Sequence, residues 1–169
     1  MLHSNRELFE QTVLRTADAT GIAASIIEKD YYVTEFLRKL TSYQPDIVFK
    51  GGTSLSKCYK LIQRFSEDID LNVEDRPSEG QRKALKRNIL AVVDDLDLSL
   101  SNAEEIRSRR DYNRYIINYP VLQGAAYLKQ QLIVETVVSM RAFPNHPMDA
   151  SSLIYDFLKD TGRDDIIHE

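Results

Sequence analysis

The feature that most constrains this chain is an ordered change of pattern between residues 46 and 74. Residues 46–50 form a short β-branched and aromatic run that ends at Gly51-Gly52, which predicts a strand running into a tight loop. Helical spacing of apolar side chains follows over residues 53–63. Residues 68–74 then alternate between polar and apolar side chains, as a strand with one buried face requires. We therefore expect strand, glycine loop, helix and strand to follow one another directly.

The glycine loop contains the residue types that bind phosphate. Gly51 and Gly52 let the backbone turn tightly and approach an anion, and the amides at the start of the following helix favour negative charge there. Thr53 and Ser54 add hydroxyl donors, and Lys57 follows on the same helical face with a positive charge for the phosphate tail. The spacing differs from that of a Walker loop. The pattern therefore predicts a phosphate site of another kind.

Carboxylates on the second strand predict a metal site. Asp68 and Asp70 share one strand face with no basic residue between them, so they repel each other unless a cation lies between them. Oxygen ligands of this kind suit Mg²⁺. Glu135 is the expected third ligand, because it is an acidic residue within the apolar run 132–138, where an unpaired charge is costly to bury. Two alternatives stay open for Glu135, exposure to solvent and an ion pair with an arginine.

The rest of the chain has the patterns of ordinary helices and strands. An amphipathic helix is expected over residues 5–19, with Ser4 placed to cap its start and Gly21 to end it. Further helices are expected over residues 26–40, 81–96 and 151–160, and further strands over residues 112–119 and 128–138. Both N-terminal helices should cover the sheet. Together these elements predict an α+β domain with a mixed β-sheet flanked by helices.

Composition limits the partners of the protein. The 169 residues are 43% apolar and 28% charged with a net charge of −4, which describes an ordinary globular protein and argues against a surface covered with nucleic-acid contacts. One stretch nevertheless has the residue types of a local basic groove: Arg107, Arg109, Arg110 and Arg114, interleaved with Tyr112 and Tyr115. This stretch fits RNA binding through phosphate contacts and stacking, although a solvated loop is the favoured interpretation.

Cysteine, histidine and hydropathy exclude other classes. Cys58 is the only cysteine, so no internal disulfide can form, and three scattered histidines do not indicate a zinc site. No apolar run approaches the length of about 20 residues that a membrane span requires. The first residues lack the apolar core of a signal peptide. We expect a cytoplasmic protein without a membrane partner.

Residues 48–71, VFKGGTSLSKCYKLIQRFSEDIDL, resemble the signature of the AbiEii/AbiGii toxin family of nucleotidyltransferases, a branch of the DNA polymerase β-like superfamily. Residues 27–33, IEKDYYV, resemble the Lys-Asp-aromatic motif that precedes the glycine loop in that family. The resemblance extends over about residues 22–140. It implies a polymerase β-like nucleotidyltransferase fold and the transfer of a nucleoside monophosphate from a nucleoside triphosphate (NTP).

The resemblance also implies roles for particular residues. Asp68 and Asp70 would ligate Mg²⁺, and with Glu135 as third ligand they would complete a site for two ions and a two-metal transfer. The triphosphate would lie on four loop residues, Gly51, Gly52, Thr53 and Ser54, with Lys57 adding charge. Lys29 and Asp30 of the aromatic motif would brace or line the nucleotide site, and the alternative for them is an exposed surface pair.

Partners and chain organisation follow from the same resemblance. Some members of that family are toxins that modify tRNA ends, and others are the toxic half of phage-defence toxin–antitoxin pairs, so we expect tRNA or another RNA as acceptor and an antitoxin as protein partner. Residues 1–140 would form the catalytic core with its N-terminal helices, and residues 141–169 a loop and the incomplete start of a helical C-terminal region. Family members usually continue there with a further functional lysine and an acidic residue. The alternatives are a nucleotide-binding module without turnover and a non-enzymatic protein that binds an antitoxin.

Overall fold

The computed structural model describes residues 1–59, 68–73, 75–120, 122, 130–139, 144–163 and 165–166. Its α-helices within these ranges are Arg6–Thr20 (α1), Ala24–Tyr43 (α2), Gly51–Lys57 (α3), Glu79–Asp95 (α4) and Leu153–Asp160 (α5). Its strands are Ile47–Lys50 (β1), Asp68–Val73 (β2), Ser99–Leu100 (β3), Tyr112–Asn118 (β4) and Gln131–Val137 (β5). Short 3-10 turns lie at Leu2–Ser4 (η1) and Ala103–Glu105 (η2). The expected α+β class is confirmed.

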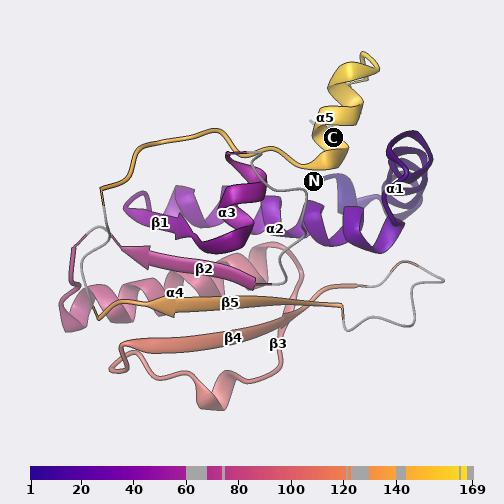
Figure 1. Ribbon diagram of the computed structural model, residues 1–169. Coiled ribbons are helices and arrows are strands. Elements are labelled where there is room, and N and C mark those ends of the chain that lie inside the picture. Colours follow the sequence, from indigo (N-terminus) through magenta and orange to yellow (C-terminus); the bar gives the residue numbers. More distant parts are fainter. Residues whose placement is uncertain are drawn as a thin grey trace.

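The sheet is mixed, with strand order β1-β2-β5-β4-β3 (Figure 1). Strands β2 and β5 run parallel, while β1 pairs with β2, β4 with β5 and β3 with β4 in the antiparallel sense. Beyond the short β3, the edge of β4 is covered by Asn102, whose side chain accepts from the Ile116 amide and donates to the Arg114 carbonyl. This side chain replaces a neighbouring strand and satisfies backbone groups that would otherwise be exposed at the edge.

The two faces of the sheet differ in character. On one face, the apolar side chains of the longer strands are buried: Ile69, Leu71, Val73, Tyr115, Ile117, Leu132 and Val134. Helices α2 and α4 cover this face with apolar stripes at helical spacing (Figure 1). The opposite face carries the alternate residues of the same strands, including Asp68, Asp70 and Glu135. A register shift of one residue would exchange the two faces, so burial of the apolar face determines where the carboxylates lie.

Helices α1 and α5 support α2. Both pack against it and against each other, and Ile154 and Leu158 of α5 belong to the same apolar core as the sheet. The sequence predicts that both N-terminal helices cover the sheet. In the structure α2 does so, whereas α1 packs mainly on α2 and α5, which occupy its apolar side. Among the described residues, no helix combines the length and the apolar character that crossing a membrane requires.

Capping decides where the first helix begins and ends. Asn5 caps α1 by accepting the Leu8 amide at 3.2 Å. The expected cap was Ser4, but Ser4 belongs to the 3-10 turn before the helix. Gly21 ends α1 in the left-handed conformation at φ 70°, as the sequence predicts.

Other elements also differ from the prediction. Helix α4 begins at Glu79, because Ser78 forms a capping box with Gln81. Helix α3 already begins at Gly51 and ends at Lys57, and residues 60–63 of the predicted helix lie outside the described residues. Strand β5 is shorter than the predicted strand over residues 128–138 and alternates between half-buried and buried residues along its length; residues 128–129 lie outside the described residues.

Candidate active site

The glycine loop lies directly against the aspartate strand. Gly51 has a left-handed backbone with φ 73°, a conformation that favours glycine. A side chain here would also collide with Asp70, since an added Cβ would lie 2.0 Å from Asp70 Oδ2 and 2.8 Å from its Cγ. Glycine is therefore required at this position for two independent reasons. The second reason is the Asp70 carboxylate on β2, which leaves no room for a side chain.

The hydroxyls that follow the loop hold the local structure together. Thr53 Oγ1 donates to the Asp68 carbonyl at 2.6 Å, and Ser54 Oγ donates to the Gly51 carbonyl at 2.8 Å. Both residues are buried and share the inner face of α3 with Lys57, as their spacing predicts. The phosphate contacts expected of Thr53 and Ser54 stay predictions. In this structure their hydroxyls fix the start of α3 against β2.

The first turn of α3 carries backbone amides without a side-chain cap. The N-cap residue Lys50 makes no capping hydrogen bond, and Gly51 is exposed while Gly52 is half-buried. The first amides of a helix have no partner within the helix, and side chains, water or a ligand can satisfy them. The start of α3 therefore has the donors that a bound phosphate would need.

Lys57 lies at the other end of α3 and contacts α2. Its ammonium group is 2.5 Å from Asp30 Oδ1, 2.7 Å from Thr34 Oγ1 and 3.2 Å from the Ser151 carbonyl. Asp30 Oδ2 accepts the Leu153 amide at 2.7 Å, so one carboxylate joins α2, α3 and the start of α5. The Lys57 side chain is only 6% exposed. In this structure its charge is thus neutralised by Asp30, and the triphosphate contact expected of Lys57 stays a prediction.

The remaining parts of the motif are less informative. Lys29, the neighbour of Asp30 on α2, is half-buried, and its expected place beside the nucleotide stays a prediction. Asp30 braces the helix that follows the glycine loop through its contact with Lys57, and its expected place beside the nucleotide stays a prediction. Ser66 and Glu67, which precede Asp68, lie outside the described residues.

One row of charged residues crosses the open face of the sheet. In the strand register Asp70 stands opposite Lys50 of β1 and Glu135 of β5, and Glu135 stands opposite Arg114 of β4. Directly paired residues point to the same face of a sheet. The row therefore runs from Lys50 through the two carboxylates to Arg114. Glu135 therefore lies on the strand beside Asp70 and on the same face, and its expected role as the third metal ligand stays a prediction.

The carboxylates of this row disturb one another. The pKa of Asp70 is raised above its ordinary value, first by burial and then by the negative charge of Glu135. Lys50 opposes this shift, and Asp68 adds to it. Clustered negative charge of this kind favours uptake of a proton or a cation.

Glu135 is held by two side chains of β4. The Tyr112 hydroxyl donates to Glu135 Oε1 at 2.8 Å, and Arg114 Nε lies 3.5 Å from the same oxygen. An ion pair with arginine, one of the alternatives for Glu135, is therefore present. Tyr112 and Arg114 were missed as neighbours of Glu135, because only the register of β4 against β5 brings them together. The available signal was a tyrosine and an arginine two residues apart on one face of a predicted strand.

The donor set fits a hard divalent cation. Asp68, Asp70 and Glu135 offer carboxylate oxygens, which are the ligands that Mg²⁺ prefers. A bound cation would offset the repulsion that, after burial, raises the pKa of Asp70. Among the described residues, no group of three or more His, Cys, Asp or Glu side chains is already arranged to hold a metal ion. Metal binding would therefore require these side chains to turn toward one another.

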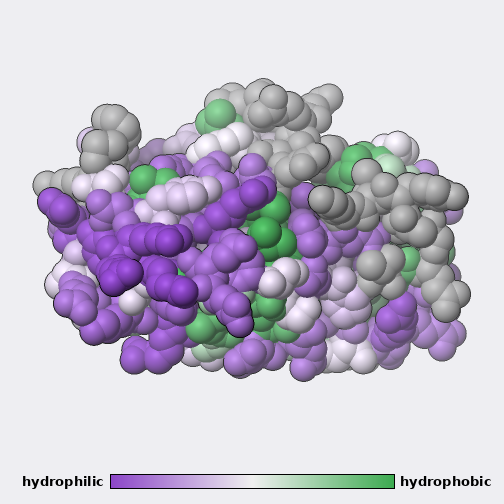
Figure 2. All heavy atoms as spheres, turned by 90° about the horizontal axis from the view of Figure 1, so that it is seen from below, coloured by the Kyte–Doolittle hydropathy of each residue, from purple (hydrophilic) through white to green (hydrophobic). Residues whose placement is uncertain are grey.

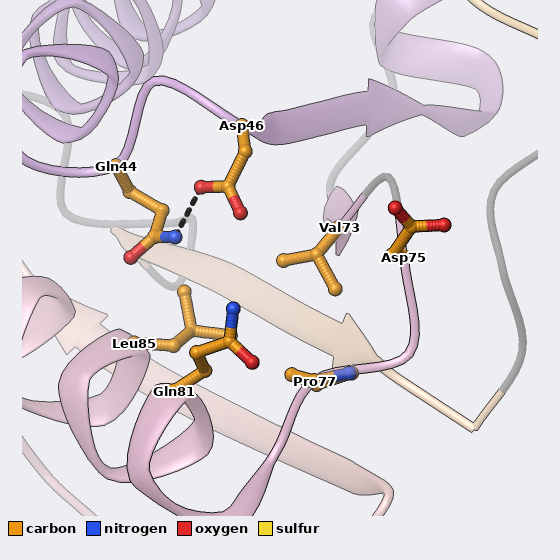
Figure 3. A pocket seen from close by; sticks show the side chains of 7 residues that line it. All are labelled: Gln44, Asp46, Val73, Asp75, Pro77, Gln81 and Leu85. Carbon is orange, nitrogen blue, oxygen red and sulfur yellow. Dashed lines mark hydrogen bonds between the residues drawn. The ribbon is translucent and has the colours of Figure 1, made fainter.

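A cavity of about 130 Å³ lies at the far end of β2 (Figure 3). Its lining comes from the connection before β1, the end of β2 and the start of α4: Gln44, Asp46, Val73, Asp75, Pro77, Gln81 and Leu85. Gln44 donates a hydrogen bond to Asp46 (Figure 3). Val73 belongs to the buried side of β2, so this cavity lies on the helix side of the sheet. It is separate from the carboxylate row.

A mixed sheet with helices on one face, and with a glycine loop packed against an aspartate strand on the other, defines an α+β domain, which is consistent with a nucleotidyltransferase-family domain. The family model for the nucleotidyl transferase AbiEii toxin of type IV toxin–antitoxin systems matches residues 35–164. The chain belongs to this family, and the resemblance noted in the sequence is confirmed. The match begins after Lys29 and Asp30 and includes α5. No curated protein and no solved structure matches the chain.

Proposed function

We propose that this protein is the toxin of a toxin–antitoxin pair and transfers a nucleoside monophosphate from an NTP to an acceptor hydroxyl, with an antitoxin as its protein partner. The contact between Gly51 and Asp70 carries the proposal. It brings a loop suited to phosphate against a candidate metal ligand. Phosphates on this loop would lie beside the carboxylates, where positioning and charge neutralisation can assist nucleotidyl transfer.

The start of α3 supports triphosphate binding. Its amides are not capped by the Lys50 side chain, and the helix dipole favours an anion at this end. The absence of a side chain at Gly51 lets a ligand approach the backbone closely. Thr53 and Ser54 would contribute rigidity, because their bonds to backbone carbonyls hold the loop before any ligand arrives.

Three carboxylates support binding of two Mg²⁺ ions. Asp68 and Asp70 would hold them from β2, and Glu135 from the paired position of β5. When bound, Mg²⁺ supplies Lewis-acid polarisation of phosphate oxygens and lowers the pKa of an attacking hydroxyl. The chain's own contribution is to hold the carboxylates on one face of a rigid sheet. Lys50 and Arg114, at the two ends of the row, add positive charge for an anionic substrate.

The surface beside Glu135 supports RNA as the acceptor, either a tRNA or another RNA. Exposed arginines lie before and within the start of β4: Arg107, Arg109, Arg110 and Arg114. Figure 2 shows the molecule from below, the side on which β4 lies in Figure 1, and strongly hydrophilic side chains gather there. Tyr112 is 47% exposed in the same region. Arginine and tyrosine suit phosphate contacts and base stacking, and Tyr112 links this surface to Glu135.

The test is incubation of the full chain with each labelled NTP, Mg²⁺ and total tRNA. We expect label on RNA with at least one NTP, and its loss on chelation of Mg²⁺ and in Asp68→Asn and Asp70→Asn. Binding of NTP without any transfer would contradict the proposal and identify a nucleotide-binding module. Absence of Mg²⁺-dependent NTP binding would contradict it more fully and leave a non-enzymatic antitoxin-binding protein.

A second test addresses the glycine loop. Gly52→Val should lower the affinity for NTP with Mg²⁺ while the unfolding transition changes little, because a β-branched side chain blocks close approach of the phosphates. Gly80→Val is a matched control, since Gly80 is likewise the second residue of a helix and its nearest neighbour beyond the backbone, Ser78 Oγ, lies 3.9 Å from an added Cβ. Unchanged NTP affinity in Gly52→Val would count against the loop as the phosphate site.

A further inference from the structure

Basic residues are concentrated where α4 meets the loop before β4. Residues 82–87 and 107–114 contain eight of the 22 lysines and arginines of the chain and a single acidic residue, Asp111. Asp111 is already paired with Arg82, so it does not neutralise the other basic residues. The chain as a whole carries a net charge of −4. Positive charge is therefore gathered at this place against the overall balance of the protein.

Two of these positive charges converge on one carbonyl oxygen. Lys86 Nζ of α4 and Arg107 Nη1 each donate to the Ile106 carbonyl at 3.1 Å. Arg110 Nη1 donates to another backbone carbonyl, that of Glu105, at 3.2 Å. Within the part of the chain that the structure describes, none of these three basic side chains has a carboxylate partner. Like charges held side by side create a local positive potential, and a bound anion would relieve their repulsion.

The loop that carries the arginines is fixed to β4. The Asn113 side chain accepts the Arg107 amide at 2.9 Å and donates to the Arg107 carbonyl at 3.0 Å, and Asn113 is itself only 8% exposed. The three arginines of the loop, Arg107, Arg109 and Arg110, are exposed. A loop that is already held in place loses little conformational freedom when its side chains bind a ligand.

The positive charge continues toward the open face of the sheet. Four residues define what we call the basic surface: Lys86, Arg107, Arg109 and Arg110. Arg114 follows Arg110 by four residues, so their Cα atoms are at most about 14 Å apart, and Arg114 Nε lies 3.5 Å from Glu135 Oε1. Figure 2 shows the side of the molecule on which β4 lies in Figure 1, and strongly hydrophilic side chains gather over it. A polyanion on the basic surface can therefore extend to the carboxylate row.

We propose that the basic surface binds the phosphate backbone of the acceptor RNA outside the catalytic face. The proposal rests on RNA as the acceptor in the proposed function, and it adds α4 and the fixed loop as the place that holds this RNA. Guanidinium groups form paired hydrogen bonds with phosphate oxygens, and the Lys86 ammonium group adds a point charge. The exposed ring of Tyr112, which follows the loop, favours a nucleic acid over an acidic protein because it can stack on a base.

Contacts of this kind determine how the RNA is held rather than which sequence is chosen. Phosphate contacts carry no direct sequence information, so the basic surface should hold RNAs of different sequence with similar affinity. Each phosphate contact also makes binding weaker as the salt concentration rises. The salt dependence of RNA binding therefore reports on this surface separately from the chemistry at the carboxylate row.

The experiment measures binding of labelled total tRNA to the full chain by fluorescence anisotropy over a range of salt concentrations. We expect Arg109→Gln with Arg110→Gln to bind tRNA about 10–100-fold more weakly at about 0.1 M salt, and the slope of log affinity against log salt to fall by about 2. Lys86→Gln with Arg107→Gln should have the same effect. Urea unfolding of the Arg109 and Arg110 double variant should match that of the wild type, because both side chains are exposed.

The matched control is Arg15→Gln with Lys159→Gln. These residues are exposed on α1 and α5, so the control removes the same amount of positive charge from a different part of the surface (Figure 1). Its tRNA affinity and salt dependence should stay close to those of the wild type. A loss as large as that of the other two double variants would show that only the net charge matters and would overturn the basic surface.

Further outcomes separate this proposal from the proposed function. If both double variants bind tRNA like the control while the wild type transfers label to RNA, the basic surface is refuted and the proposed function stands. If tRNA binding depends on the basic surface but no nucleotide is transferred, the surface is supported and the proposed function fails. Displacement of tRNA by poly-glutamate at an equal concentration of charges would overturn RNA as the ligand and assign the surface to an acidic protein.

Discussion

Replacement of Gly51 by alanine should destabilise the fold more than the same change at other left-handed glycines. Gly21 and Gly162 have φ values of 70° and 67° and nothing within 4 Å of an added Cβ. At Gly51 the added Cβ would lie 2.0 Å from Asp70 Oδ2. All three changes force alanine into the left-handed region, and only the change at Gly51 adds a collision. The three variants thus separate backbone strain from packing.

The two effects differ in size. A left-handed backbone costs a residue with a Cβ about 1–2 kcal/mol, and the reduced freedom of the unfolded chain offsets about 0.4–1 kcal/mol of this. Gly21→Ala should therefore lower the free energy of unfolding by about 1 kcal/mol. Overpacking adds about 1–3 kcal/mol, so Gly51→Ala should lower it by about 2–4 kcal/mol. Rotation of the Asp70 carboxylate relieves only part of the collision, because Asp70 Cβ would also lie 3.1 Å from the new methyl group.

Urea unfolding of the variants and the wild type at one pH measures these differences. A double-mutant cycle with Asp70→Ala isolates the collision, because alanine lacks the Oδ2 and Cγ atoms. In that background the effect of Gly51→Ala should shrink by about 1–3 kcal/mol. Equal effects of Gly51→Ala and Gly21→Ala, or the same effect of Gly51→Ala in both backgrounds, would refute the contact between the glycine loop and the aspartate strand.

Three further changes test the charges of the structure. The raised pKa of Asp70 means that its ionised form destabilises the empty fold, so stability rises as the pH falls through this pKa. Asp70→Asn should therefore keep or raise the melting temperature at pH 7 and lose the stabilisation by Mg²⁺ and NTP. A destabilised variant that still responds to ligand would contradict this. Lys57→Met leaves Asp30 buried without its cation and should lower the free energy of unfolding in urea by about 3–5 kcal/mol. The double variant Lys57→Met with Asp30→Asn should recover most of this loss. A double variant as unstable as the single one would argue against the ion pair. Burial raises the pKa of Glu28 to about 7 against an opposing hydrogen bond from the Leu122 amide, so the free energy of unfolding should fall as the pH rises through about 7. Glu28→Gln keeps an acceptor and should remove this pH dependence. An unchanged pH dependence would assign it to another group.

Much of the site follows from the sequence, because it depends on neighbours along the chain. The alternation of residues 68–73 puts Asp68 and Asp70 on one face of β2 whatever lies beside that strand. The end of β1 at Lys50 and the start of a helix at Gly51 depend in the same way on local propensity. The ends of helices are less predictable, because a competing cap such as Asn5 stands within one residue of the expected one.

Only the tertiary structure decided which distant groups meet. The parallel register of β2 and β5 brings Glu135 opposite Asp70, and β4 adds Tyr112 and Arg114 to Glu135, since burial of one sheet face selects one register among those that the strands allow. Lys57 is a second residue whose partner could not be predicted from the sequence. Its place on α3 was predictable, but the packing of α2 against α3 pairs its charge with Asp30. Periodicity determines which way a side chain points from its own element, and only the packing of elements determines what it meets there.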